Sequence, residues 1–379
     1  MKTVQSSIIC FIDFEDNIEE NFESMTKIFK DQKINNDRNK LKMLLRLIAG
    51  IIDNHYRVNN FFTKVERILL VFKKDIKNFY TNWEIFNIFK SNKRILLFFF
   101  QQKIITFDEY IIKTMYSNKY MLENFLLYFL PEIRNLKKEK WFLNLRNKKY
   151  DYIVERELPE NFLENRIIGE NHSSLCKIIR DDLIDDFIFY FNQNKLSVNS
   201  IIDSSIYETN SFLIKKQKEY KINFLFNDNQ ESSGISLIQY AAFFGSIKIF
   251  DFLRSHGADI TQSLSVFAIH GRKIEIIQDI QLSIQMKSSL CLTKESIKCH
   301  HNCIFDYIQM NYPDNDDENS NRIFTNSLKY YNFEILESGF TANSLINLCK
   351  YDYYILVDFI LKSKDIDINI IQINFLMIF

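Results

Sequence analysis

Five consecutive residues, Cys299-His300-His301-Asn302-Cys303, form the densest group of metal-ligand side chains in the sequence. Cysteine thiolates and histidine imidazoles are the usual ligands of zinc. On a single helix Cys299 and Cys303 share a face, whereas the two histidines point about 100° and 200° away, so the four cannot converge on one ion. The sequence has no second Cys/His cluster to complete the set. We therefore predict no metal site, and keep a metal-responsive regulatory module centred on residues 299–303 as an alternative.

Residues 313–320 begin like a calcium-binding loop, with Asp314, Asp316 and Glu318 at alternating positions. Such a loop needs a glycine at its sixth position and a bidentate glutamate at its twelfth. Asn319 and Thr325 occupy these two positions. We therefore predict a polar loop between helices and no bound calcium.

Two histidines, His256 and His270, are expected at helix ends, where the helix dipole favours a positive charge at the C-terminus. Neither has a nucleophile or a carboxylate at a spacing that indicates catalysis. The sequence also lacks a P-loop, a dinucleotide-binding fingerprint and a serine-nucleophile motif. We therefore predict that the protein is not an enzyme, that it has no catalytic residues and that it binds no cofactor.

Basic residues surround Trp141 and Phe142 between positions 137 and 149, a pattern that single-stranded nucleic-acid binders use. Acidic residues such as Glu139 and Asp151 lie close by, and the 48 basic residues of the chain are balanced by 48 acidic ones. A neutral chain has no global attraction to nucleic acid. We expect a solvated connector here and no nucleic-acid partner, with nucleic-acid binding as a further alternative.

The scarcity of glycine and proline indicates an all-α protein. The 379 residues include 7 glycines and 3 prolines, whereas average usage is roughly 7% and 5%, and β-rich folds need these residues for frequent turns. No apolar run reaches the roughly 18 to 20 residues of a membrane-spanning helix. Six dispersed cysteines and no secretory signal favour reduced thiols and a cytoplasmic protein.

Residues 1–150 are predicted to form a region of helical hairpins of unknown function. Leu44, Leu47, Ile48, Ile51 and Ile52 recur at the spacing of one helical face. Phenylalanines at helical spacing are expected to fill the core of this region. Three capping boxes predict helix starts. They are Thr63–Glu66, Thr81–Glu84 and Thr106–Glu109.

A helix is also expected from Leu122 to Leu130, ended by Pro131, because proline removes a backbone donor and clashes with the preceding turn.

Residues 234–261 show the clearest hairpin pattern in the chain. An apolar helical face that includes Ala241 and Ala242 is interrupted by Gly245, and a second face ends at Gly257. Glycine at these two places suits a backbone with positive φ. Small alanines at positions 241 and 242 allow two helices to approach closely. The sequence therefore predicts two antiparallel helices joined by a tight turn.

Weaker hairpins of the same kind are expected on both sides of this segment. Residues 172–191 break at Asp181-Asp182, whereas residues 203–233 lack periodicity and are predicted to be an insertion. Gly271 follows Gly245 by 26 residues (271 − 245), less than the roughly 33 of a full ankyrin repeat. Further helix pairs are expected at about residues 297–307, 328–336 and 345–361.

The segment from Ala241 to Ile260 resembles an ankyrin repeat, although Ser236, Leu237 and Gln239 stand where that pattern has threonine, proline and histidine. The whole chain is similar to a family of protozoan ankyrin-repeat proteins with a helical domain of unknown function before the array. The stretches that carry this second resemblance begin at Leu44, Asn82, Ile206, Leu237 and Glu295.

The resemblance implies degenerate ankyrin repeats over residues 165–379 and protein–protein interaction without enzymatic activity. Ankyrin repeats bind through exposed positions of the first helix, which here are Tyr240, Phe243 and Phe244, flanked by Ser236 and Gln239. Packing of the three aromatic side chains against the next hairpin is the alternative.

We therefore predict an all-α solenoid of antiparallel helix hairpins, ankyrin-like in its C-terminal half. Its expected function is that of a monomeric, cytoplasmic interaction scaffold, which binds an unknown protein partner through a concave surface.

Overall fold

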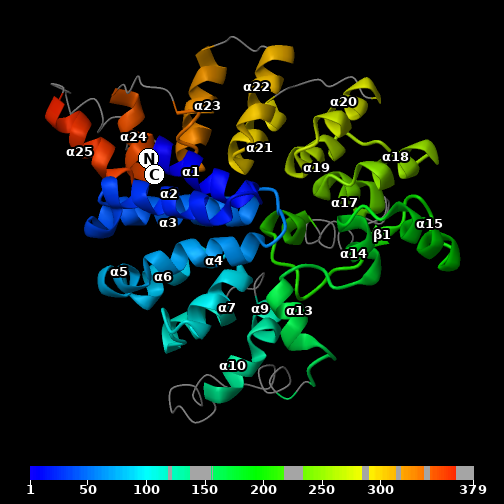
Figure 1. Cartoon of the computed structure of the whole chain (residues 1–379), viewed down its shortest axis with the longest axis horizontal. Helices are drawn as coiled ribbons and strands as arrows, with labels where there is room; N and C mark the ends of the chain where they lie inside the picture. The colour runs from blue at the N-terminus through cyan, green and yellow to red at the C-terminus, as the bar shows by residue number, and fades with distance from the viewer. Residues whose placement is uncertain are drawn as a thin grey trace. The chain divides into compact units, whose positions relative to one another are not determined.

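The computed structural model describes residues 1–117, 122–136, 155, 157–216, 234–283, 290–312, 317–336 and 342–363. These residues are almost entirely helical (Figure 1), which confirms the predicted all-α class. The strands among them are β1 (Ile201–Ile202) and β2 (Ile235–Ser236), which pair antiparallel with Ile201 opposite Ser236. Within this described part, no helix has the length and apolar character that crossing a membrane requires.

The helices group into two compact units. The first unit combines residues 1–71 with residues 272–379, and the second comprises residues 72–271. The sequence predicted a different division, between a helical-hairpin region at residues 1–150 and a repeat region that starts at residue 165. This boundary stays a prediction, since residues 137–154 lie outside the described part. The same holds for much of the insertion predicted at residues 203–233, of which residues 217–233 are not described.

The first unit is built around α3, which carries the broadest buried stripe of this unit. Its five predicted stripe residues, Leu44 to Ile52, are at most 1% exposed. The neighbours α1 and α4 pack against each other, α21 packs on α3, α22 and α23, and α25 packs on α3 and α24. The elements of this unit are α1 (Lys2–Asp13), α2 (Ile18–Asp31), η1 (Ile34–Asn36), α3 (Arg38–Asn54), α4 (Phe61–Val71), α20 (Ile274–Ser283), α21 (Leu290–Cys299), α22 (Asn302–Asn311), α23 (Asp317–Lys329), α24 (Ala342–Lys350) and α25 (Tyr354–Ser363).

The second unit contains the phenylalanine-rich core and the best-patterned hairpin. Phe86, Phe89, Phe99 and Phe129 are at most 1% exposed, which confirms the predicted core role of these side chains. The helices of this unit are α5 (Lys73–Phe79), α6 (Asn82–Phe89), α7 (Lys93–Gln101), α8 (Glu109–Ser117), α9 (Leu122–Tyr128), α10 (Leu130–Asn135), α13 (Phe162–Ile168), α14 (Ser174–Arg180), α15 (Ile184–Gln193), α17 (Leu237–Phe244), α18 (Ile247–Ser255) and α19 (Leu264–Gly271).

One of the three predicted capping boxes is confirmed. Thr81 precedes α6, accepts a hydrogen bond from the Glu84 amide and receives the Glu84 side chain on its own amide. The box at Thr63 is wrong, because Thr63 lies inside α4. The box at Thr106 is also wrong: α8 begins at Glu109, and the Asp108 carboxylate accepts the Ile111 amide. The Thr-x-x-Glu spacing therefore also occurs inside a helix, as at Thr63, and next to another capping residue, as at Thr106 beside Asp108.

Pro131 begins a helix instead of ending one. The helix expected from Leu122 stops at Tyr128 as α9, and Pro131 occupies the first turn of α10. Proline is tolerated there because the first helical amides have no partner within the helix. The predicted end at Pro131 is therefore wrong by two to three residues.

Two predicted hairpins are confirmed and lie side by side in the second unit (Figure 1). Gly245 joins α17 to α18 with φ +67°, and Gly257 follows α18 with φ +86°. The α14–α15 turn contains Asp182, whose carboxylate accepts the Lys248 and Ile249 amides at 3.1 and 3.0 Å. Asp182 therefore satisfies the first amides of α18 and ties one hairpin to the next.

The remaining predicted pairs are confirmed in part. The pairs at residues 297–307 and 345–361 correspond to α21–α22 and α24–α25. At residues 328–336 α23 ends at Lys329, and the described residues 330–336 form turns without a second helix.

Candidate functional site

Ser236 and Gln239 form the capping box of α17. The Ser236 hydroxyl accepts the Gln239 amide, and the Gln239 side chain accepts the Ser236 amide. Gln239 is 7% exposed and its side-chain amide donates to the Ser263 hydroxyl. Both residues therefore have a local structural role at the start of the hairpin.

The aromatic residues of α17 are buried, so the expectation that they are exposed is wrong. Tyr240, Phe243 and Phe244 are 1%, 5% and 8% exposed. The Tyr240 hydroxyl accepts a hydrogen bond from Arg180 at 3.1 Å, and Phe243 stacks with Phe212 at 5.8 Å between ring centroids. Burial raises the pKa of Tyr240 well above its ordinary value. The alternative, in which these rings pack against neighbouring elements, is the arrangement that the structure has.

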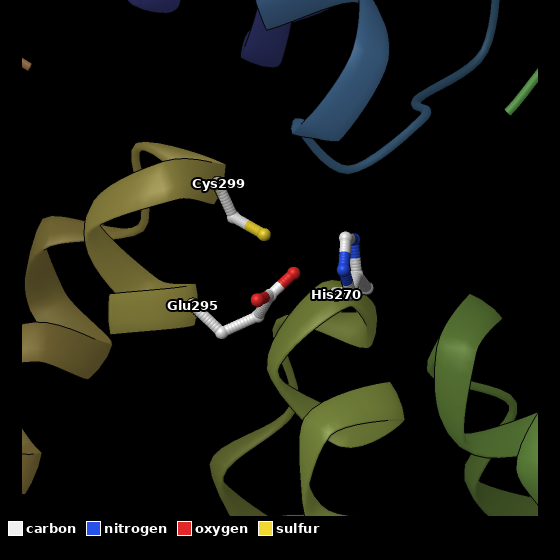
Figure 2. Close-up of side chains that lie close together, drawn as sticks. All are labelled: His270, Glu295 and Cys299. Carbon is white, nitrogen blue, oxygen red and sulfur yellow. The ribbon is translucent and has the colours of Figure 1, made fainter. Parts of the chain in front are cut away.

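The Cys299–Cys303 run does not lie on one helix, so the helical geometry expected for it is wrong. α21 ends at Cys299, His300 turns the chain with φ +58°, and α22 begins at Asn302. Cys299 is buried and Cys303 is exposed. Glu295 and Cys299 lie one turn apart and project from the same side of α21 (Figure 2). Burial raises the pKa of the Cys299 thiol well above its ordinary value, which favours the protonated form over the metal-binding thiolate.

The other residues considered for chemistry fall into two groups. His256 and His270 are at helix ends as predicted. The His256 ring lies at the end of α18, 2.7 Å from the Phe252 carbonyl. His270 is in the last turn of α19, and its ring stacks on that of Phe243 with 4.9 Å between centroids. The basic segment 137–149 and residues 313–316 of the calcium-like loop lie outside the described residues.

The first unit contains a groove of about 1460 Å³ between α1, α22 and α23. α22 lines it with one helical face, because Asn302, Phe305, Asp306 and Gln309 follow the i, i+3, i+4, i+7 spacing. α1 contributes Lys2, Thr3 and Ser6, and α23 contributes residues that include Asn321 and Phe324. The groove therefore has both apolar rings and polar side chains on its walls.

Glu334 holds two walls of the groove together. Its carboxylate accepts a hydrogen bond from the Ser6 hydroxyl of α1 at 2.6 Å and another from the Asn302 amide of α22. Ser6 is therefore engaged with a carboxylate, and the described residues that line the groove include no histidine that could serve as its general base. This arrangement positions α1 beside α22 and provides hydrogen-bonding groups for a ligand.

A network of buried side-chain amides connects α1 and α22 behind the groove. Gln5 is 0% exposed; its side chain donates to Asn332 at 2.9 Å and accepts the Phe333 amide at 2.6 Å. Asn332 in turn donates to the Asn302 side chain at 2.9 Å and to the Ile297 carbonyl at 3.0 Å. Buried amides whose hydrogen bonds are all made in this way fix side-chain positions. The network therefore fixes the position of α1 relative to α22 along the groove.

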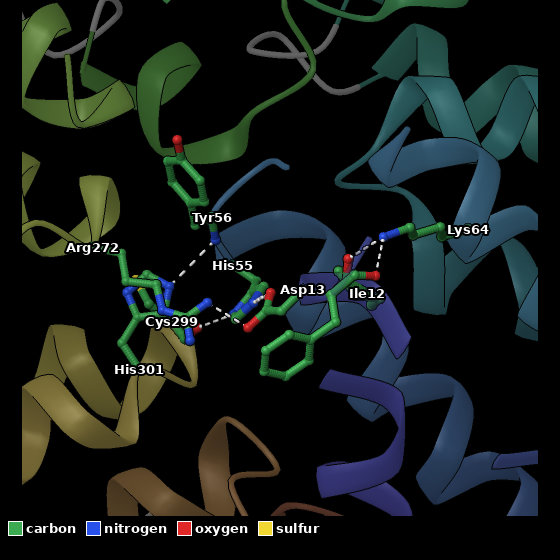
Figure 3. Close-up of polar contacts among 9 residues, drawn as sticks. Ile12, Asp13, His55, Tyr56, Lys64, Arg272, Cys299 and His301 are labelled. Atoms are coloured by element: carbon green, nitrogen blue, oxygen red, sulfur yellow. Dashed lines mark hydrogen bonds and ion pairs between the residues drawn. The ribbon is translucent and has the colours of Figure 1, made fainter. Parts of the chain in front are cut away.

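A second polar cluster surrounds the C-terminal end of α1 (Figure 3). The Lys64 ammonium donates to the carbonyls of Ile12 and Phe14 at 2.7 and 2.9 Å. Next to them, the Asp13 carboxylate pairs with Arg272 and lies 2.8 Å from His55 Nε2. Lysine is favoured beside the carbonyls that end a helix, so this cluster anchors the end of α1.

Local sequence patterns gave no indication of the groove or of this cluster. Ser6 and Glu334 are 328 residues apart, and Asp13 and His55 are 42 apart. One residue near the groove gives a signal in the sequence. Gln5 lies with Val4 and Ile8 on the apolar face of α1, and a buried side-chain amide needs a hydrogen-bond partner.

No protein-family model matches the chain, and neither a curated protein nor a solved structure is similar to it.

Proposed function

We propose that the protein is a non-enzymatic interaction scaffold that binds a linear segment of a partner protein in the groove between α1, α22 and α23. The observation that carries this proposal is the groove itself, about 1460 Å³ in volume and lined by residues of α1, α22 and α23 together with residues 334–336 and Ser344 of α24. Its volume exceeds the roughly 300 to 1,000 Å³ of small-molecule pockets, which favours a peptide as the ligand.

The lining defines the chemistry of the segment that fits. Phe305 and Phe324 offer apolar contacts, and the side-chain amide of Asn321 can pair with the main chain of an extended peptide. The Gln309 amide already donates to the Thr293 hydroxyl at 3.2 Å. Among the described residues that line the groove, the charged ones are Lys2, Asp306 and Glu334, so carboxylates outnumber ammonium groups there. We infer that the preferred segment carries an apolar anchor next to a basic residue.

The hairpins supply the rest of the proposal. The α14–α15 and α17–α18 pairs, whose turns contain the left-handed residues Asp182 and Gly245, support an ankyrin-like stack in the second unit. Repeats of this kind are stabilised by contacts between neighbours. In this proposal the second unit is a solenoid of helix hairpins, and the protein acts as a monomer in the cytoplasm.

Peptide display tests the proposed groove. A random peptide library is selected against the full-length protein, and the affinity of the selected peptides is measured by fluorescence anisotropy. Phe305→Glu places a charge on the α22 wall and is expected to weaken binding at least tenfold. Met310→Glu is the matched control, because Met310 lies on the same helix, is 80% exposed and does not line the groove.

Two outcomes would contradict the proposal. Either no peptide with an apolar anchor and a basic neighbour is enriched, or the enriched peptides bind the Phe305→Glu and Met310→Glu proteins equally well. Circular dichroism of both variants establishes that the fold is retained.

A further inference from the structure

The Glu334 carboxylate is the final acceptor of a chain of hydrogen-bonded side-chain amides. Gln5 donates to Asn332 at 2.9 Å. Asn332 donates to Asn302 at 2.9 Å, and Asn302 in turn donates to Glu334. The Phe333 backbone amide fixes the direction of this chain, because it can only donate and so requires the side-chain oxygen of Gln5 on its side. Every amide in the chain therefore directs its NH₂ group towards the next residue, and the last one is directed at Glu334.

This chain holds the carboxylate in one orientation at the wall of the groove. Gln5 and Asn332 are both 0% exposed, so water does not compete for their hydrogen bonds. The Ser6 hydroxyl donates to the other oxygen of Glu334 at 2.6 Å. Glu334 itself is partly exposed and lines the groove. A ligand group that binds this carboxylate consequently has little ordering of the protein to overcome.

The negative charge of Glu334 has no positive partner within the described part of the chain. Its two hydrogen-bond donors there, Ser6 and Asn302, are neutral groups. Lys2 lines the same groove but is exposed and forms no ion pair with Glu334. Neutral donors orient a carboxylate without cancelling its charge, so a cationic ligand group is electrostatically favoured at this place.

The acceptor sites that remain on Glu334 fit one kind of cation. A carboxylate has about four lone-pair sites, two on each oxygen. Ser6 uses one site on Oε1 and Asn302 uses one on Oε2, which leaves one site on each oxygen. An arginine guanidinium donates two parallel N–H groups, one to each carboxylate oxygen, whereas a lysine ammonium acts as a point charge. The remaining sites therefore match arginine better than lysine.

An apolar wall adjoins this carboxylate. Asn302, which holds Glu334, is at the start of α22, and Phe305 lines the groove one helical turn further along the same face. Asp306 lies beside Phe305, is exposed, and adds a second negative charge to the groove. A cation held by Glu334 thus places the neighbouring part of its peptide against Phe305.

We propose that Glu334 is the specificity-determining residue of the groove, and that it selects partner segments in which an arginine accompanies the apolar anchor. This assignment rests on the proposed function, and it replaces the general preference for a basic residue by a preference for the guanidinium group. Asp306 has a different role: its exposed charge attracts any cation and does not distinguish arginine from lysine.

Matched peptides test the selection of arginine. A peptide obtained by display against the full-length protein is synthesised with arginine, lysine or glutamine at its basic position, and its affinity is measured by fluorescence anisotropy. The arginine peptide should bind at least fivefold more tightly than the lysine peptide and at least tenfold more tightly than the glutamine peptide. Equal affinities of the arginine and lysine peptides overturn the proposal.

Three variants of the protein assign this difference to Glu334. Glu334→Gln should weaken the arginine peptide at least tenfold and reduce the arginine-to-lysine ratio below twofold. Asp306→Asn should weaken the two peptides by the same factor. Glu318→Gln is the matched control, since Glu318 is an exposed residue of α23 that pairs with Arg322 and does not line the groove; it should leave both affinities unchanged. Circular dichroism establishes that each variant is folded.

The results separate this inference from the proposed function. Peptides that lose affinity in Phe305→Glu but bind Glu334→Gln as well as the wild-type protein overturn the role of Glu334 and leave the groove as the binding site. Peptides that are insensitive to both substitutions overturn the groove itself, and with it the role of Glu334.

A single-residue probe tests Glu334 without a selected peptide. Nα-acetyl-arginine amide and Nα-acetyl-lysine amide are titrated separately into the full-length protein at millimolar concentration, and the side-chain amide signals of Asn302 are followed by NMR. The arginine compound should shift these signals and the lysine compound should not. Equal shifts with the two compounds, or arginine-dependent shifts that persist in Glu334→Gln, overturn the proposal.

Discussion

The backbone of Gly271 lies directly against that of Ala242. A Cβ atom added to Gly271 would be 2.0 Å from the Ala242 carbonyl oxygen and 2.8 Å from the Gly245 amide nitrogen. This contact joins α19 to α17, so the two helices approach to a distance at which any side chain at position 271 is excluded. Close packing of α19 on α17 therefore explains why position 271, 26 residues after Gly245, is a glycine.

Substitution of Gly271 by alanine should destabilise the second unit. The methyl group would meet backbone atoms, which cannot move aside as a flexible side chain can, and the expected loss is about 3 kcal/mol. That corresponds to a fall of roughly 6 to 12 °C in Tm, measured by circular dichroism. Gly50→Ala in α3 is the matched helical glycine, since its nearest atoms are at 3.5 and 3.7 Å; it should gain about 0.5 to 1 kcal/mol. Equal effects of the two substitutions would contradict the close approach.

His300 should make the first unit sensitive to acid. Its pKa of about 3 in the folded protein is below the ordinary 6.5, so the unfolded chain binds the proton first and stability falls as the pH drops from about 6.5 towards 3. Between pH 7 and pH 5 this amounts to about 2 kcal/mol. Urea unfolding at the two pH values measures it.

The comparison for this prediction is His300→Asn. Asparagine tolerates the positive φ of +58° at this position and does not titrate. The variant should therefore lose about 2 kcal/mol less than the wild-type protein between pH 7 and pH 5. Parallel pH profiles would show that the buried ring of His300 is not the acid-sensitive group.

Thr81 and Thr63 should respond oppositely to alanine. Thr81→Ala removes the hydroxyl that accepts the Glu84 amide at the start of α6 and should cost about 1 kcal/mol. Thr63 is an exposed residue within α4, where alanine is the better helix former, so Thr63→Ala should be neutral or stabilising by a few tenths of a kcal/mol. Urea unfolding of both variants checks the difference; a loss of about 1 kcal/mol in each would restore the box predicted at Thr63.

Tyr240 should behave as a core residue. Tyr240→Phe removes one hydrogen bond to Arg180, which also bonds the Asn171 carbonyl and Glu170, so a loss of about 1 kcal/mol is expected. Tyr240→Ala should cost about 3 to 5 kcal/mol because it leaves a cavity. Phe189→Ala, at a position that is 70% exposed, should change stability by less than about 0.5 kcal/mol. If Tyr240→Ala unfolds no more readily than Phe189→Ala, the buried placement of Tyr240 is wrong.

Local patterns were sufficient for most helices and for the turns that glycine defines. The apolar period placed α3, and Gly245 placed the α17–α18 turn, because both depend on residues within one or two helical turns of each other. The same local reasoning failed at Thr106, where Asp108 is the cap, and at Pro131, where the chain had already turned before the proline. Two competing local signals lie close together in these places, and their relative strength depends on what the helix packs against.

The sequence alone determined the all-α class, the hairpin at residues 234–261 and the absence of a recognisable catalytic motif, because helix periodicity and turn residues act over short distances along the chain. The tertiary structure decided which side chains are exposed and which polar groups meet. It buried Tyr240, joined Ser6 to Glu334 in the groove and placed His55 between Asp13 and the Cys299 carbonyl. These contacts connect residues separated by up to 328 positions, and only the packing of whole helices determines which of them come together.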